Sequence, residues 1–220
     1  IIKMELPKIK DSYNYENNFY LSCNTQRIGK FLAHYELFKM SSNIPGSIIE
    51  CGIFKGNSLI RFASFKKLGI SKSKKIIGFD MFGKFPETNF QKDKKMRKLF
   101  IKESGSVGIS KQQLIKVLKQ KKIDQKIELV KGNIIQTVPN YVKTHPKLKI
   151  SFLNLDTDLY EPSKIILEYL YPKITKGGIL LLDDYGFWPG ETKAVDEYFK
   201  NKKVKIKKSS FSNTPLYIIK

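Results

Sequence analysis

The sequence predicts an α/β fold in which helices cover both faces of a mostly parallel sheet. Three observations support this prediction. Short apolar runs bounded by turn residues alternate along the chain with stretches of helical spacing. Most of these runs are continuously apolar, which is typical of strands buried on both faces. The last two strand-like runs follow each other across a turn, which predicts a closing antiparallel hairpin.

The first part of the chain predicts helix before the sheet begins. Apolar residues at helical spacing cover residues 17–40, and Pro45-Gly46 then interrupts the pattern. We therefore expect a helical N-terminal segment, residues 1–45, packed on one domain of residues 46–220. The elements expected in that domain are strand 47–54, helix 57–68, strand 75–80, helix 110–120, strand 126–130, helix 134–142, strand 149–156, helix 161–171, strand 178–183, helix 192–200, and strands 204–207 and 215–219.

Residues 81–109 separate the second strand from the next clear helix. The segment is rich in Lys, Gly and Ser with scattered aromatic residues. A connection of this length inside a compact domain is usually functional. We expect it to form an active-site lid.

The charge of the chain invites a nucleic-acid interpretation. The formal net charge is +21, and a basic surface attracts phosphate backbones. The arginines, however, are Arg27, Arg61 and Arg97, and the lysines are spread over nearly every helix and loop without interleaved aromatic residues to stack bases. We favour a solvated lysine-rich surface over a nucleic-acid partner; an acidic substrate stays open.

Cysteine usage and hydropathy bear on location. Cys23 and Cys51 are too few for a disulfide framework. No stretch approaches the ~20 apolar residues that span a bilayer, and the first four residues lack signal-peptide features. We expect a soluble cytoplasmic protein without a membrane span.

Glycine-rich or acidic sequence follows the first two strands, at the edge where parallel sheets bind ligands. The first strand runs into Glu50-Cys51-Gly52 and on to Gly56 and Ser58, where glycines allow close backbone approach and the next helix offers free amides. This is neither the dinucleotide fingerprint nor a P-loop. The second strand ends at Asp80, where an acid accepts hydrogen bonds from ribose hydroxyls; a turn or helix cap is the equally good alternative.

Four aspartates follow the fourth and fifth strands. They are Asp156 and Asp158 on one side and Asp183 and Asp184 on the other. Four neighbouring carboxylates repel one another unless a cation lies between them, and Mg²⁺ prefers oxygen ligands. The alternative is that Asp158 caps a helix and Asp184 forms a turn, but a cap needs one acid and not four.

These stretches, taken in this order, resemble the macrocin O-methyltransferase (TylF-like) family of sugar O-methyltransferases from antibiotic biosynthesis. The resemblance covers about residues 20–199. Its most specific motifs are Asp156-x-Asp158-x-Tyr160-Glu161 and the glycine pair that precedes Asp183-Asp184-Tyr185. The matching stretches are residues 26–37, 45–58, 79–87, 131–133, 155–161 and 177–185.

The resemblance implies a Rossmann-like class I methyltransferase with a seven-stranded, mostly parallel sheet and an antiparallel last strand. It implies S-adenosylmethionine and Mg²⁺ as cofactors, a hydroxyl of a sugar or sugar-nucleotide-like small molecule as acceptor, and a homo-oligomer, expected to be a dimer. The general base would be Asp158. The implied metal ligands are Asp156, Asp183 and Asp184, and the implied cofactor contacts are Glu50, Gly52, Gly56 and Ser58 for the methionine part, Asp80 for the ribose, and Gly132 and Asn133 for the adenine.

The chain departs from the family in the loop after the second strand. Met81 and Lys84 stand where family members often have Ser and Glu, which leaves the acceptor open. Histidine is the usual general base, but we interpret His34 and His145 as structural or surface residues. Tyr185, Phe187 and Trp188 are interpreted either as an apolar wall of the acceptor pocket or as core residues.

Two other functions stay open. A metal-dependent glycosyltransferase also uses an Asp-x-Asp pattern such as Asp156-Thr157-Asp158, although the Glu-x-Gly loop and the Asp-Asp-Tyr strand end argue against it. A basic RNA-binding protein with a degenerate methyltransferase fold is disfavoured because the acidic cluster is complete.

Overall fold

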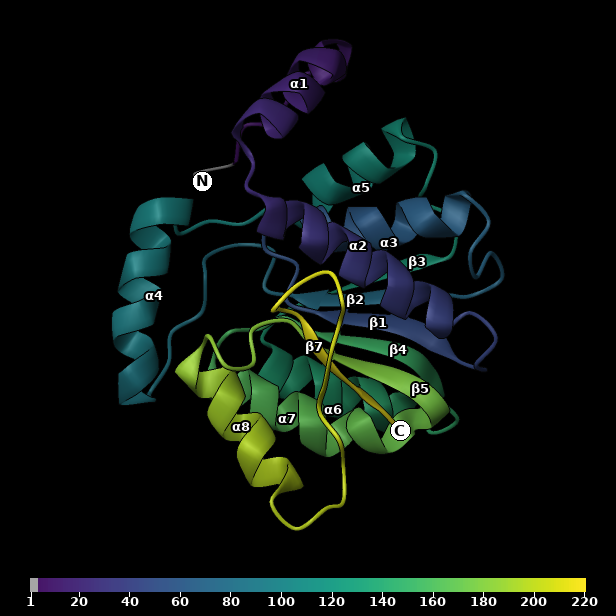
Figure 1. Ribbon diagram of the computed structural model, residues 1–220, viewed down its shortest axis with the longest axis vertical. Helices are drawn as coiled ribbons and strands as arrows, with labels where there is room; N and C mark the ends of the chain where they lie inside the picture. Colours follow the sequence, from purple (N-terminus) through teal and green to yellow (C-terminus); the bar gives the residue numbers. More distant parts are fainter. Residues whose placement is uncertain (1–3) are drawn as a thin grey trace.

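The computed structural model describes residues 4–220, and its centre is a seven-stranded sheet (Figure 1). The strand order is β3-β2-β1-β4-β5-β7-β6, with β1 to β5 parallel, β7 antiparallel to β5 and β6 antiparallel to β7. This confirms the predicted sheet. The strands are β1 (Ser47–Cys51), β2 (Ile76–Asp80), β3 (Ile127–Lys131), β4 (Ile150–Leu155), β5 (Ile174–Leu182), β6 (Lys207–Lys208) and β7 (Leu216–Ile219).

Helices cover both faces of the sheet (Figure 1). α2, α3 and α5 lie on one face, and α6, α7 and α8 on the other. Because successive strand residues point to opposite faces, Ile48 joins the core under α2 and α3 while Ile49 joins the core over α6 and α7. The bounds are α2 (Thr25–Met40), α3 (Asn57–Lys67), α5 (Lys111–Gln120), α6 (Ile134–Thr144), α7 (Tyr160–Tyr169) and α8 (Pro189–Phe199).

The predicted lid contains a helix that the sequence pattern did not predict. α4 (Gln91–Ser104) stands at the side of the molecule and contacts α8 (Figure 1). Its inward face mixes the half-buried Met96, Phe100 and Ile101 with polar residues, and Asp93 is its one fully buried side chain. A pattern method that looks for amphipathic spacing therefore finds nothing here.

The N-terminal segment consists of two helices with different surroundings. α1 (Ser12–Ser22) ends at Cys23, and Asn24 then caps α2 by accepting a hydrogen bond from the Arg27 amide at 3.1 Å. α2 buries Leu37 and Phe38 against the domain, whereas α1 buries no residue and projects from the body (Figure 1). Residues 1–3 of the predicted segment lie outside the described residues.

The C-terminal hairpin is confirmed, but its first strand is shorter than predicted. β6 begins only at Lys207, because Val204 and Ile206 pack against the core instead of pairing with a strand. Among the helices of residues 4–220, none is long and apolar enough to cross a membrane.

Candidate active site

The carboxyl ends of β1, β4 and β5 meet at one edge of the sheet and carry the acidic residues. β4 lies between β1 and β5, and Glu50 pairs in register with Asn154. The ladder continues past the strand ends, because the Asp156 amide donates to the Cys51 carbonyl and the Asp183 amide to the Leu155 carbonyl, both at 3.0 Å. The backbone therefore places the predicted acids side by side.

Three of these acids form a compact cluster. Carboxylate oxygens of Asp156, Asp158 and Asp184 all lie within 4.8 Å of one another. Burial, together with the charge of neighbouring acids such as Asp156, raises the pKa of Asp158 to about 8. Burial and nearby acids also raise the pKa values of Asp156 and Asp184. Such crowding disfavours three negative charges, and a bound cation would relieve it.

Asp158 adopts an unusual backbone conformation. Its φ of 62° lies in the left-handed region, which costs a non-glycine residue energy. The carbonyl of Asp158 accepts a hydrogen bond from the Glu191 amide at 3.1 Å, and the Glu191 carboxylate accepts one from the Asp184 amide at 3.1 Å. Glu191, at the start of α8, thus connects the two acidic strand ends.

Asp183 points to a different set of partners. Its carboxylate pairs with Lys30 Nζ and lies 3.2 Å from His34 Nε2, both on α2. Burial alone would raise the pKa of Asp183, but the charge of Lys30 and the hydrogen bonds from Lys30 and His34 together outweigh it and hold the pKa well below its usual range. The predicted metal ligand Asp183 therefore faces the Lys30 ammonium and the His34 imidazole, while the predicted base Asp158 lies in the carboxylate cluster.

Lys30 and His34 were not assigned to the site from the sequence. His34 is buried and lies 3.0 Å, through Nδ1, from the Arg61 guanidinium; burial lowers its pKa. Lys30 and His34 are four residues apart on one helix, so they share a face. This four-residue spacing, within the stretch 26–37 on which the resemblance rests, was the one sequence feature that could have assigned Lys30 and His34 to the site.

The residues expected to hold the methionine part of a cofactor surround Glu50. Its side chain is fully buried, and one carboxylate oxygen accepts a hydrogen bond from Ser58. The other oxygen has no hydrogen-bond partner among residues 4–220, and neither has the amide of the adjacent, buried Asn154. Burial raises the pKa of Glu50 to about 8. Unpartnered buried polar atoms at this edge are suited to a ligand with polar groups.

Asp80 supports the loop that follows β1. Its carboxylate accepts hydrogen bonds from the amides of Ile53 at 2.8 Å and Phe54 at 3.1 Å. Gly52 within this loop has a φ of 91°, and a Cβ there would overlap the carbonyl oxygen of Asp156. The glycine is thus required for close packing of the loop against the end of β4, and Gly56 is the N-cap residue of α3.

Gly132 and Asn133 follow β3, next to Asp80. The Gly132 amide donates to the Asp80 carbonyl at 2.9 Å, and the Asn133 side chain caps α6 by accepting from the Ile135 amide at 3.0 Å. All predicted cofactor residues therefore lie at the same edge of the sheet as the acids. Their contacts with a cofactor stay predictions.

Aromatic residues from three segments gather beside the acidic edge. Ring centroids of Phe85 and Phe100 are 5.0 Å apart, Phe100 lies 5.2 Å from Phe54, and Trp188 lies 6.0 Å from Phe100. Trp188 is buried in this cluster. Phe187 is 64% exposed, so the two neighbouring aromatics differ in surroundings.

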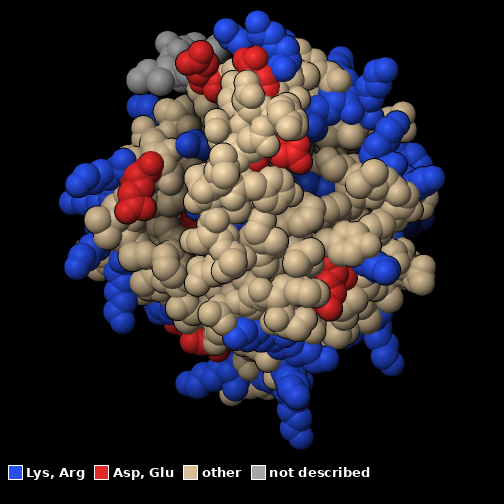
Figure 2. Space-filling view, turned by 45° about the horizontal axis from the view of Figure 1, so that its top comes forward, with Lys and Arg blue, Asp and Glu red and all other residues tan. Residues whose placement is uncertain are grey.

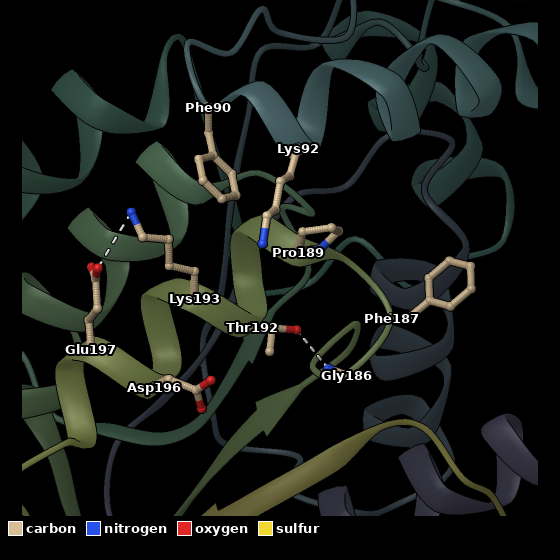
Figure 3. Close-up of a pocket in the computed structure, with 9 residues that line it drawn as sticks. All are labelled: Phe90, Lys92, Gly186, Phe187, Pro189, Thr192, Lys193, Asp196 and Glu197. Atoms are coloured by element: carbon tan, nitrogen blue, oxygen red, sulfur yellow. Dashed lines mark hydrogen bonds and ion pairs between the residues drawn. The ribbon is translucent and has the colours of Figure 1, made fainter.

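A surface hollow of about 430 Å³ lies between the lid and α8 (Figure 3). One wall comes from Phe90 and Lys92 of the lid, and the other from Lys193 and its neighbours on α8. Phe187 borders the hollow and follows Asp184 by three residues. One residue that lines the hollow thus lies three positions along the chain from an acid of the cluster.

Comparison with known proteins identifies relatives of the whole described domain. The model of the macrocin-O-methyltransferase (TylF) family matches residues 24–218. The chain is 27% identical over 161 residues to the demethyldecarbamoylnovobiocin O-methyltransferase of Streptomyces niveus, which covers 72% of this chain and 60% of that protein. It is 23% identical over 171 residues to the mycinamicin III 3''-O-methyltransferase of Micromonospora griseorubida, with 76% and 65% covered. The matches thus span less than two thirds of these relatives.

Solved structures show the same fold. The O-methyltransferase NovP superposes with a TM-score of 0.75 at 22% identity, covering 88% of this chain and 80% of that one. The apo structure of CalS11, a TDP-rhamnose 3'-O-methyltransferase of calicheamicin biosynthesis, gives a TM-score of 0.67 at 24% identity, with 98% and 87% covered.

Proposed function

Because the chain belongs to the macrocin-O-methyltransferase (TylF) family, we propose that it methylates a hydroxyl of a sugar or sugar-nucleotide-like molecule, with S-adenosylmethionine as donor and Mg²⁺ as metal. The observation that carries this proposal is the cluster of Asp156, Asp158 and Asp184 within 4.8 Å, beside the buried and half-unpartnered Glu50. The family match also argues against the glycosyltransferase alternative.

The cofactor would lie along the carboxyl ends of β1, β2 and β3. The unpartnered oxygen of Glu50 is available to a donor group of the methionine part. Asp80 and Gly52 keep the loop after β1 close to β4, which leaves that edge open to the ribose and to the adenine beside Gly132 and Asn133.

The acids fit a hard divalent cation by their chemistry and by their crowding. Asp156 and Asp184 are the residues proposed to hold Mg²⁺. Asp183, the third ligand expected from the sequence, has its carboxylate engaged by Lys30 and His34 in this structure. A bound Mg²⁺ supplies a lowered hydroxyl pKa and stabilises negative charge on oxygen. Lys30, whose pKa is raised by Asp183, Asp156 and Asp184 even though burial lowers it, adds a fixed positive charge at the same edge.

Asp158 is the proposed general base. Burial raises its pKa above that of an ordinary aspartate, so its carboxylate form is the stronger base of the two. The acceptor hydroxyl gives its proton to the Asp158 carboxylate, and its oxygen forms a bond to the methyl carbon. S-adenosylmethionine, when bound, would supply the methyl group, and its sulfur would keep the electron pair of the broken carbon–sulfur bond to give S-adenosylhomocysteine. The backbone hydrogen bonds that fix Asp158 and Asp184 would contribute to the rate by holding the base in a fixed orientation toward the acceptor hydroxyl.

The experiment that tests this function measures methylation by mass spectrometry, with S-adenosylmethionine, Mg²⁺ and a panel of sugar nucleotides that begins with TDP-rhamnose. A mass increase of one methyl group on any acceptor supports the proposal. Calorimetric titration with S-adenosylhomocysteine is the companion measurement, and absence of binding with and without Mg²⁺ would overturn it.

We also propose a homodimer formed through α1. Residues 11–26 contain no Lys or Arg in a chain of net charge +21, and Tyr13, Tyr20 and Leu21 are 73%, 64% and 87% exposed. An apolar hollow on α2 includes Tyr35 and Met40. The view in Figure 2 shows a broad central region with few charged side chains and with Lys and Arg at its rim. α1 of one copy would pack on α2 of the other.

Light scattering after size exclusion tests the dimer. Leu21→Lys should convert a particle of twice the chain mass into one of the chain mass, whereas Leu68→Lys, at an 82% exposed position on the end of α3, should not.

A cytoplasmic location is proposed as well, since Cys23 and Cys51 are both free.

A further inference from the structure

We propose that Asp93 and Glu161 form a reciprocal latch between the lid and the starts of α7 and α8, and that this latch sets the geometry of the acceptor side of the acidic cluster. Both are positioning residues. The coupling to acceptor binding rests on the proposed function, whereas the latch itself does not. Glu161 closes the Asp-x-Asp-x-Tyr-Glu motif, and the chemistry above leaves it without a role.

One half of the latch runs from α7 to the lid. The Glu161 carboxylate accepts hydrogen bonds from the Thr88 hydroxyl at 2.9 Å, the Asn89 amide at 2.8 Å and the Phe90 amide at 3.2 Å. Phe90 is the N-cap residue of α4 and offers no side-chain cap of its own. Glu161, 71 residues away in sequence, therefore supplies a carboxylate at the start of the lid helix.

The other half runs from the lid to α7 and α8. Asp93, on the first turn of α4, is fully buried, and its carboxylate accepts a hydrogen bond from the Tyr160 amide at 2.9 Å. The backbone of Gly190, at the start of α8, lies directly against this carboxylate, because a Cβ at Gly190 would overlap Oδ2 of Asp93. The other oxygen, Oδ1, has no hydrogen-bond partner among residues 4–220. The N-cap residues of α7 and α8, Leu159 and Trp188, make no side-chain cap. One lid carboxylate thus caps the start of α7 and packs against the start of α8.

These two helix starts directly follow the acids of the site. Tyr160 is two residues after Asp158, and Gly190 precedes Glu191, which bonds both Asp158 and Asp184. If the lid moves away, the start of α7 loses its cap and the start of α8 loses its packing contact with Asp93. The position of Asp158, already held in a left-handed conformation, then loses support. Lid closure and the geometry of the acidic cluster are therefore coupled.

The latched lid also forms one wall of the hollow in Figure 3. Phe90 and Lys92 of the lid face Pro189 and Lys193 of α8 there. Further along α4, Phe100 packs against Phe54 and Trp188. The two carboxylates of the latch thus hold the lid wall of this hollow in place.

Limited proteolysis with trypsin tests the latch without any acceptor. α4 carries Lys92, Lys94, Lys95, Lys98 and Lys102, which are cleaved only when the lid helix opens. Asp93→Asn and Glu161→Gln should each speed cleavage within residues 92–102 at least about tenfold, as located by mass spectrometry. Glu103→Gln, an acid-to-amide change on the exposed side of the same helix, should leave the rate within twofold of wild type.

Two results would overturn the latch. One is cleavage of both variants within twofold of wild type. The other is faster cleavage spread evenly over the chain with a matching loss of thermal stability, which would mean a general structural role. Thr88→Val removes one donor to Glu161 and serves as a milder variant if the others fold poorly.

Binding of Mn²⁺, followed by electron paramagnetic resonance, tests the coupling to the acids. Asp93→Asn should weaken Mn²⁺ binding at least about fivefold, with S-adenosylhomocysteine affinity unchanged. Faster lid cleavage with unchanged Mn²⁺ affinity would overturn the coupling. Wild-type protein that binds no Mn²⁺ would count against the proposed metal and against the coupling, while the proteolysis result would still decide the latch.

Discussion

Asp183 and Asp184 are neighbours in sequence, yet they lie in opposite electrostatic surroundings. Asp183 faces α2, where Lys30 neutralises its charge and His34 lies at hydrogen-bond distance, and its pKa is lowered. Asp184 faces Asp156 and Asp158, and burial beside these acids raises its pKa. The protein itself satisfies one carboxylate and leaves the other crowded with like charge. The difference separates an acid that fastens the N-terminal helix from acids prepared for a ligand.

The largest effect is expected from removing the proposed base on the crowded side. Asp158→Asn should lower turnover about 10²- to 10⁴-fold, the usual contribution of a general base, with S-adenosylhomocysteine binding retained. Released S-adenosylhomocysteine is the measured quantity. Asp124→Asn, an exposed acid remote from the cluster, is the control. Near-normal turnover of Asp158→Asn would remove this residue from the mechanism.

Lys30→Met tests the Asp183 half of this comparison, because it removes the positive charge that pairs with Asp183. Asp183 is 2% exposed and would keep its charge with only His34 beside it, while Lys30 is 33% exposed. Because solvent already screens part of the pair, we expect a loss of about 2 kcal/mol in the free energy of unfolding, below the 3 to 5 of a fully buried pair. Urea denaturation measures it. Lys116→Met on exposed α5 surface should change little, and an equal loss there would contradict the pairing.

Glu50, like Asp184, is a buried acid with a raised pKa, and the pH dependence of stability tests its protonation. Its folded pKa of about 8 lies above the ordinary value of 4.5, so the folded state retains a proton that the unfolded state releases. Stability should therefore fall as pH rises from about 4.5 to 8, by at most about 1.4 kcal/mol per pH unit for one proton. Thermal unfolding of Glu50→Gln across this range should lack that part of the slope. Parallel curves for both proteins would contradict the buried, protonated carboxyl.

The smallest effect expected is stabilisation by Mg²⁺. Binding to the folded state alone adds about 1 kcal/mol at a concentration near five times Kd, because stabilisation follows mass action. A rise in Tm with Mg²⁺ should be seen in wild-type protein and lost in Asp184→Asn. A rise of the same size in that variant would place the metal elsewhere.

The sequence predicted the positions of the acids better than their partners. Asp156, Asp158, Asp183 and Asp184 follow apolar strand runs, and parallel strands bring their carboxyl ends to one edge, so their proximity was predictable. The pairing of Asp183 with Lys30 spans 153 residues, and no local pattern marks it. Asp80 and Gly52 were expected to serve a cofactor, and the structure shows in addition that they hold the β1 loop.

The lid segment was likewise predicted in its position but not in its contacts. Its length and place after the second strand predicted a functional segment, but α4 was missed because its inward face is only half-buried and mixes apolar with charged residues. What stabilises it lies elsewhere, in Glu161 and in the start of α8.

The sequence by itself determined the alternation of strands and helices, the mixed sheet and the edge at which the chemistry lies, because burial periodicity and turn residues are local properties. Only the tertiary structure decided which carboxylates are neutralised, which are crowded, and which of them cap helices in other segments. Those outcomes depend on contacts between residues such as Asp93 and Tyr160, 67 positions apart, which exist only once the helices have packed on the sheet.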